Sequence, residues 1–120
     1  MLINELSKKT GISTHTIRFY EKSGLIKGKQ NESVKSNNYF HYDDITVEKL
    51  EFISDAKSVG FTIKEIGQII DAWYNKKYTK KQKREILEDK LSSLELKMKE
   101  IKEMKKQLLQ FKDDVENDRC

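Results

Sequence analysis

The fold of this chain is decided near its start, by residues 3–24, INELSKKTGISTHTIRFYEKSG. A first helix is predicted from apolar and small residues at helical spacing, namely Ile3, Leu6 and Thr10. Gly11 stops that helix, because glycine tolerates the left-handed backbone that such a stop needs. Ser13 is then a good N-cap for a second helix, worth roughly 1 kcal/mol over alanine. Two short helices around a glycine turn predict a helix-turn-helix.

The second predicted helix has one apolar and one polar face. It buries Ile17 and Tyr20, and it ends at Ser23-Gly24. Its exposed face carries Thr14, His15, Arg18, Phe19 and Lys22. Arg, Thr and His side chains reach phosphates or base edges, and an aromatic ring packs on sugar. The pattern is therefore typical of a DNA-recognition helix, although an ordinary solvated amphipathic helix has the same outline.

A hairpin is predicted directly after the helix-turn-helix. Its two short strands are Leu25-Ile26 and residues 39–42, YFHY. The long polar connection between them carries lysines, namely Lys27, Lys29 and Lys35. A hairpin in this position is a wing, and its lysines suit either a phosphate-facing loop or a plain surface loop.

Two further helices follow the hairpin. Asp43 caps the third, in which Val47, Leu50, Ile53 and Ala56 recur at three-residue spacing up to Gly60. A capping box, residues 62–65, begins the fourth. The fourth helix is predicted to bury Ile63, Ile66, Ile70 and Trp73. Its interior Gly67 costs about 1 kcal/mol against alanine, which indicates close packing at that position.

From Thr79 to Val115 the apolar residues follow a different rule. Steps of four and three separate Leu87, Leu91, Leu94, Met98 and Ile101, and the stripe then shifts to Met104, Leu108 and Phe111. This is a coiled-coil seam on a helix about 55 Å long. A head of some 75 residues cannot cover so long a stripe, so we expect a second copy of the chain to do so. The alternative is a helix that folds back on its own head.

Composition and charge limit the possible functions. The apolar share is 36% and the charged share 37%, which favours an elongated helical protein over one with a deep core. A net charge of +4 over residues 1–42 suggests a polyanionic partner for that region, whereas lysine-rich helices such as 75–106, with a net charge of +6, are also often simply solvated. No apolar run is long enough to span a membrane and no secretory signal is visible, so a cytoplasmic location is expected. No nucleophile–base set or phosphate-binding loop is readable, which argues against an enzyme.

Four motifs in fixed order resemble the mercury-resistance-regulator (MerR) family of bacterial transcription factors. They are residues 3–13, INELSKKTGIS; 16–26, TIRFYEKSGLI, close to the family's T-I-R-Y-Y-E-x-x-G-L; 37–42, NNYFHY, matching N-G-Y-R-x-Y; and Leu50-x-x-Ile53 with 60–66, GFTIKEI. The resemblance implies a mostly α fold with a winged helix-turn-helix DNA-binding domain over 1–74. The remainder, 75–120, would hold a linker, the long dimerisation helix and a short effector-region tail.

Membership of that family implies a mechanism. Two heads would be joined by an antiparallel pair of long helices into a homodimer. The dimer would bend and untwist an overlong promoter spacer so that RNA polymerase can use it. Arg18, Phe19, Tyr20 and Tyr39 match DNA-contacting positions of the family. Thr14 and His15 lie where members vary and read bases, and Lys35 is a further DNA-binding candidate in the wing. The dimer seam would consist of Leu87, Leu91, Leu94, Met98, Ile101 and Leu108. The wing departs from the family pattern, with Asn38 for glycine and Phe40 for arginine, so Lys35 or Lys29 would supply its charge.

No cofactor is evident and no metal site is predicted, with Cys120 the one candidate metal ligand. Cys120 is the one cysteine and cannot form an internal disulfide. The family's metal-ligand positions carry Lys80 and Val115, and a soft metal needs at least two thiolates or equivalent ligands. The effector therefore stays undetermined. Two alternative functions remain open: an effector-independent architectural or excisionase-like DNA-bending protein, and a coiled-coil interaction protein that does not bind DNA.

Overall fold

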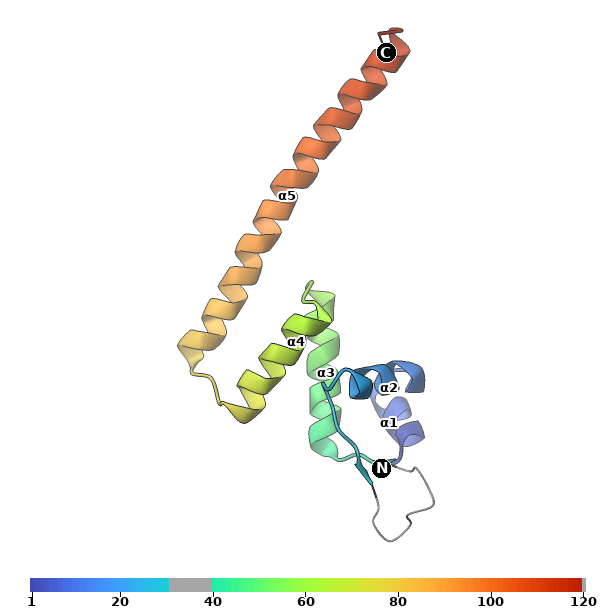
Figure 1. Ribbon diagram of the computed structural model, residues 1–120, viewed down its shortest axis with the longest axis vertical. Coiled ribbons are helices and arrows are strands. Elements are labelled where there is room, and N and C mark those ends of the chain that lie inside the picture. Colours follow the sequence, from blue (N-terminus) through green and yellow to red (C-terminus); the bar gives the residue numbers. More distant parts are fainter. Residues whose placement is uncertain (31–39, 120) are drawn as a thin grey trace. The chain divides into compact units, whose positions relative to one another are not determined.

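The computed structural model describes residues 1–30 and 40–119, which form two compact units. The first unit, Met1–Lys77, is called the head. Its elements are α1 (Ile3–Thr10), α2 (Thr14–Lys22), β1 (Lys29–Gln30), β2 (Phe40–His41), α3 (Asp44–Ser58), α4 (Ile63–Ile70) and the π-helical turn η1 (Asp71–Asn75) (Figure 1). The second unit begins at Tyr78 and contains α5 (Lys80–Glu116). None of the described helices is both long and apolar enough to cross a membrane.

The predicted helix-turn-helix is confirmed. Gly11 ends α1 with φ 75°, and its N–H donates to the carbonyl of Ser7 at 2.8 Å. The Ser13 hydroxyl accepts from the backbone N–H of Thr16 at 3.2 Å and so caps α2. Helix α1 contacts both α2 and α3, and this packing leaves the outer face of α2 at the surface of the head (Figure 1).

The predicted strand at Leu25-Ile26 is wrong. The strands are β1 and β2, which pair antiparallel with Lys29 opposite His41. Leu25 and Ile26 are both buried, and they follow the left-handed Gly24 at φ 82°. Consecutive residues of a strand alternate between two faces, whereas these two neighbours both fill the core. The connection between the strands, with Asn38, Lys35 and Tyr39, lies outside the described residues.

Helix α3 supplies the centre of the head's core. Asp43 caps it, because its carboxylate accepts from the backbone N–H of Thr46 at 3.0 Å. This hydrogen bond lowers the pKa of Asp43 below its ordinary value. The residues predicted to face the core are all buried, namely Val47, Leu50, Ile53 and Ala56. Together with the fully buried Leu6, Ile17 and Ile66, they join the four helices α1 to α4 in one apolar core.

Helix α4 begins as predicted and ends differently. The capping box between Thr62 and Glu65 is present in both directions. Ile66 and Ile70 are buried as predicted, and Ile69 is buried too, whereas Ile63 and Trp73 are only half-buried. The helix widens into η1, where the N–H of Lys76 donates to the carbonyl of Asp71. A π turn has more residues than an α turn, so Trp73 leaves the buried stripe.

The glycine in α4 has a packing role. A Cβ at Gly67 would lie 3.3 Å from Cδ2 of Leu25, closer than side chains ordinarily approach. Close packing between α4 and the segment after α2 therefore accounts for this helix-interior glycine.

Helix α5 agrees with the predicted 79–115 to within one residue at each end. Thr79 begins it with a second capping box, in which Thr79 and Gln82 exchange hydrogen bonds. Over 37 residues it rises about 55 Å. None of its residues is buried. Just after the helix, Arg119 forms ion pairs with Asp113 and Asp114 in its last turn.

Candidate DNA-binding surface

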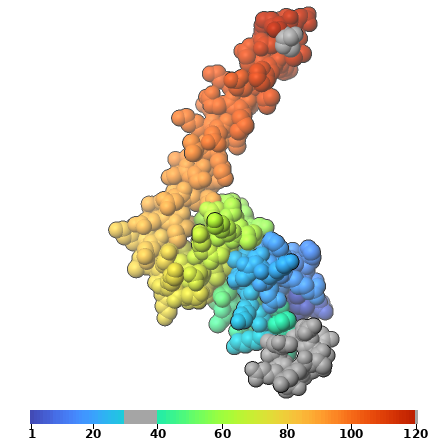
Figure 2. Space-filling model, in the orientation of Figure 1, coloured from blue at the N-terminus to red at the C-terminus, as the bar shows by residue number. Residues whose placement is uncertain are grey.

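The outer face of α2 combines charged, polar and apolar side chains. His15, Arg18 and Lys22 are exposed, and Thr14 is half-buried. Phe19 is 49% exposed, which is unusual for so large an apolar ring. Helices α1 and α2 together form one continuous part of the head's surface (Figure 2). A face of this composition offers cations for phosphates and an apolar group for sugars and base edges.

Tyr20 lies elsewhere than its predicted DNA-binding role requires. Only 4% of it is exposed, so its side chain belongs to the core. It is three residues after the fully buried Ile17 and shares that face of α2. Its ring contacts the ring of Phe19, with centroids 6.0 Å apart. Direct DNA contact by Tyr20 therefore disagrees with the structure, and its position supports Phe19 from behind.

The base of the wing adds charge and exposed aromatic surface beside α2. Lys29 on β1 is exposed and lies opposite the exposed His41 on β2. Phe40, which replaces the family's wing arginine, is 37% exposed. Of the predicted wing contacts, Lys35 and Tyr39 fall outside the described residues. Lys29 is therefore the described cation of the wing.

Glu21, which the sequence analysis did not single out as a site residue, holds the wing base to α2. Its Oε1 accepts the backbone N–H of Gly28 at 2.9 Å. Its two carboxylate oxygens also accept the hydroxyl of Tyr42, at 3.2 and 3.1 Å. Burial, reinforced by the charge and hydrogen bond of Glu21 and opposed by the charge of Arg18, raises the pKa of Tyr42 to about 12. Tyr42 therefore stays a neutral donor at physiological pH.

A second surface lies along α5. Of the predicted seam residues, Leu87, Leu91, Met98, Ile101 and Leu108 are exposed, and Leu94 is half-buried. Met104 and Phe111, on the shifted part of the stripe, are exposed too. So much exposed apolar surface along one helix is typical of an interaction surface.

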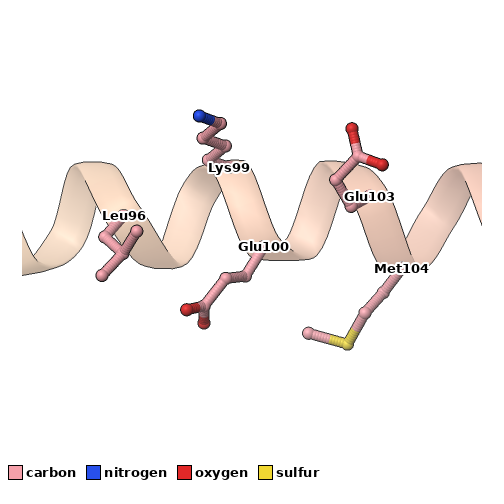
Figure 3. Close-up of a pocket in the computed structure, with 5 residues that line it drawn as sticks. All are labelled: Leu96, Lys99, Glu100, Glu103 and Met104. Atoms are coloured by element: carbon pink, nitrogen blue, oxygen red, sulfur yellow. The ribbon is translucent and has the colours of Figure 1, made fainter.

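A shallow hollow on α5 is not a ligand pocket. It is lined by Leu96, Lys99, Glu100, Glu103 and Met104 (Figure 3). Leu96, Glu100 and Met104 point to one side of the helix, and Lys99 and Glu103 point to the other. All five residues lie on one helix, so the hollow has no opposite wall. It is a stretch of helix surface that a neighbouring molecule could cover.

The described residues offer no metal centre. Among residues 1–30 and 40–119, no group of three or more His, Cys, Asp or Glu side chains is placed to hold a metal ion. Cys120 lies outside the described residues.

A helix-turn-helix with a two-stranded wing, followed by a long exposed helix, defines a class of DNA-binding transcriptional regulators. Residues 1–73 match the family described as "MerR HTH family regulatory protein", and residues 47–111 match "MerR, DNA binding". The chain belongs to the MerR family and is a DNA-binding transcriptional regulator. The match supports the regulator hypothesis and gives no support to the architectural or excisionase-like alternative.

Relatives with similar sequences are named as regulators. The HTH-type transcriptional regulator HmrR of Rhizobium leguminosarum bv. viciae is 31% identical over 108 residues, covering 90% of this chain and 81% of the relative. A probable heavy metal-dependent transcriptional regulator of Haemophilus influenzae is 30% identical, covering 97% and 88%. Both relatives are thus named as transcriptional regulators, the class of protein predicted from the sequence.

A solved structure has the same fold. The transcription regulator PbrR691 from Ralstonia metallidurans CH34, solved in complex with lead(II), superposes with a TM-score of 0.82. The alignment covers 95% of this chain and 86% of that one, at 24% identity. At this identity the likeness supports the fold alone.

Proposed function

We propose that the chain acts as a homodimer in which two heads bind the two halves of a pseudo-palindromic promoter site. The observation that carries this proposal is the uncovered apolar seam on α5, on the same chain as a DNA-binding head. Pairing of two seams would bury apolar surface that one chain leaves in water, and burial is worth about 25 cal/mol per Å². Two-fold symmetry in the protein then requires a symmetric DNA site.

Within each head, α2 would enter the major groove. Thr14 and His15, near the start of the helix, would read base edges, as residues at the start of a recognition helix do. Arg18 would bind phosphate, and Phe19 would pack against sugar. The wing, through Lys29 and the predicted Lys35 and Tyr39, would hold the flanking backbone. Tyr20 would contribute by packing beneath Phe19.

The regulatory step would be a deformation of the DNA. A dimer bound to both halves of an overlong spacer can bend and untwist it, and so align the promoter elements for RNA polymerase. On a template whose spacer has been shortened to ordinary length, the protein should lose its stimulating effect on transcription while still occupying the site. Equal stimulation on both templates would contradict the deformation step.

Replacing one cation tests the DNA-binding face. Arg18→Ala should weaken binding to every site and reduce the slope of log affinity against log salt by about 0.9, the value for one phosphate contact. Fluorescence anisotropy at several salt concentrations measures both quantities. Lys57→Ala, at an exposed lysine in the last turn of α3, is the matched control and should change neither. An unchanged affinity and slope for Arg18→Ala would remove Arg18 from the interface.

A further inference from the structure

We propose that Glu21 is a positioning residue for DNA binding, which fixes the base of the wing relative to the recognition helix. This inference rests on the proposed function, because it concerns how two DNA-contacting elements of one head are held in a common geometry. The name "Glu21 clamp" is used below for the hydrogen bonds that join Glu21 to Gly28 and Tyr42.

The clamp spans both strands of the wing. Glu21 lies in the last turn of α2, one turn after Arg18. Gly28, whose N–H it accepts at 2.9 Å, comes directly before β1. Tyr42, whose hydroxyl it accepts at 3.1 and 3.2 Å, comes directly after β2. One carboxylate therefore connects the DNA-facing helix to the point where the wing leaves the head and the point where it returns.

The packing at Gly28 shows how close the parts of the clamp approach. A Cβ at this position would lie 2.7 Å from Cβ of Phe40, 2.9 Å from Cε1 of Tyr42 and 3.0 Å from Oε1 of Glu21. No side chain fits there without moving the opposite strand. Only a residue without a side chain allows β1, β2 and α2 to meet at this distance.

The surroundings make the clamp rigid. Tyr42 is 5% exposed and Gly28 is buried, so water does not readily replace Glu21 as their acceptor. Hydrogen bonds to an ionised carboxylate are stronger than those to a neutral acceptor. Tyr42 is also tied on its other side, because its backbone N–H donates to the carbonyl of Met1 at 2.8 Å. A shift at Gly28 would be passed directly to Lys29, the next residue and the described cation of the wing.

A positioning role and a merely stabilising role predict different results in a double-mutant cycle on DNA affinity, measured with the full chain. We expect Lys29→Ala to weaken binding several-fold in the unmodified protein. In a Glu21→Gln background the same change should cost little, because the wing is already displaced. Glu5→Gln, the same substitution at an exposed position on α1, is the control and should leave the cost of Lys29→Ala unchanged. An equal cost of Lys29→Ala in all three backgrounds would overturn the proposal.

A second variant covers the case in which Glu21→Gln fails to fold. Tyr42→Phe removes only the hydroxyl that donates to Glu21, and it should reduce the cost of Lys29→Ala in the same direction but by less. An undiminished cost in a folded Tyr42→Phe protein would contradict a clamp acting through Tyr42.

A measurement without DNA separates this inference from the proposed function. Residual dipolar couplings of the backbone amides report the orientation of β1 and β2 relative to α2. In the Glu21→Gln or Tyr42→Phe protein this orientation should change, while that of α1 relative to α3 should not. An unchanged wing orientation overturns the positioning role, whether or not the protein binds promoter DNA. If the wing orientation changes in the variants but the unmodified chain binds no promoter, the clamp is supported and the proposed function is contradicted.

Discussion

The head and α5 differ in how far they bury their large apolar side chains. In the head, five such residues are fully buried: Leu6, Ile17, Leu50, Ile53 and Ile66. In α5 no residue is buried, and many are more than half exposed: Leu87, Leu91, Leu96, Met98, Ile101, Met104, Leu108, Leu109, Phe111 and Val115. The head thus closes a core from its own elements, whereas a single helix has no second surface to pack against. The same chemistry leads to a closed core in one region and an interaction surface in the other.

The largest effect is expected from a charge placed in the seam. Met98→Lys should convert the dimer to monomers and abolish tight promoter binding, because an unpaired buried ammonium is strongly unfavourable. Leu94→Lys should act in the same way. Sedimentation velocity measures the assembly directly.

A matched control lies on the same helix. At about 100° per residue, Leu96 lies on the opposite face of α5 from Met98, and it is similarly exposed. Leu96→Lys should therefore remain dimeric. If instead Leu96→Lys splits the dimer and Met98→Lys does not, the contact lies on the face that carries Leu96 and Glu100 (Figure 3).

The second effect tests the closed core. Leu50→Ala deletes most of a fully buried side chain and should lower the free energy of unfolding by about 3 kcal/mol. Urea unfolding followed by the fluorescence of Trp73, which lies in the head, measures this. The variant should still sediment as a dimer under native conditions, since the seam is untouched. A loss below about 1 kcal/mol would mean that the site collapses around the cavity.

A smaller effect is expected at alkaline pH, and in the head alone. The folded-state pKa of Tyr42 is about 12, above the ordinary value of 10, because of burial and the facing carboxylate of Glu21, opposed by Arg18. Because folding raises the pKa of Tyr42, the unfolded state loses the phenol proton at a lower pH than the folded state does. The contribution of neutral Tyr42 to the free energy of unfolding is therefore fully present below pH 10. It is lost as the pH rises toward 12.

Spectroscopy isolates this group. Helix α5 contains no tyrosine, so the alkaline titration of tyrosine absorbance reports on groups outside that helix. Tyr42→Phe should remove the latest-titrating component and flatten the fall in stability above pH 10. The idea fails if the titration curve of the variant, scaled for one fewer tyrosine, matches that of the unmodified protein.

The smallest effect is expected at the thiol. Cys120→Ser should leave both DNA binding and dimerisation unchanged, because one thiol per chain is a poor ligand set for a soft cation. Titrating the protein and the variant with copper(I), zinc and mercury(II), with transcription as the readout, checks this. A tight stoichiometric complex that activates transcription and disappears in Cys120→Ser would show that the end of the chain is a sensor.

Local sequence signals predicted the boundaries of most helices. The residues that mark helix ends act on backbone groups only a few positions away, so their effect can be predicted from the neighbouring sequence. They are Gly11, Ser13, Thr62 and Thr79. Helix α1 ends at the residue before Gly11, and α2, α4 and α5 begin at the residue after Ser13, Thr62 and Thr79 respectively. The apolar stripe of α5 could also be predicted from the sequence, because it depends only on the helical period and not on distant neighbours.

Predictions that depended on distant neighbours were less accurate. Leu25-Ile26 has strand-like composition, yet it packs against α4 near Gly67, 42 residues further along the chain from Leu25. Trp73 continues the apolar period of α4 in sequence, and only the widening of η1 removes it from that stripe. Tyr20 was assigned both to the core and to DNA, and its burial decides between them.

The sequence by itself therefore determined the helix-turn-helix, the caps, the long helix and the family, because these rest on short-range backbone chemistry and on ordered motifs. Only the tertiary structure decided that Glu21 joins α2 to Gly28 and Tyr42. These partners lie 7 and 21 residues away from Glu21 along the chain. The sequence around a helical glutamate does not indicate which groups will donate hydrogen bonds to it. The packing of the wing base against α2 determines those partners.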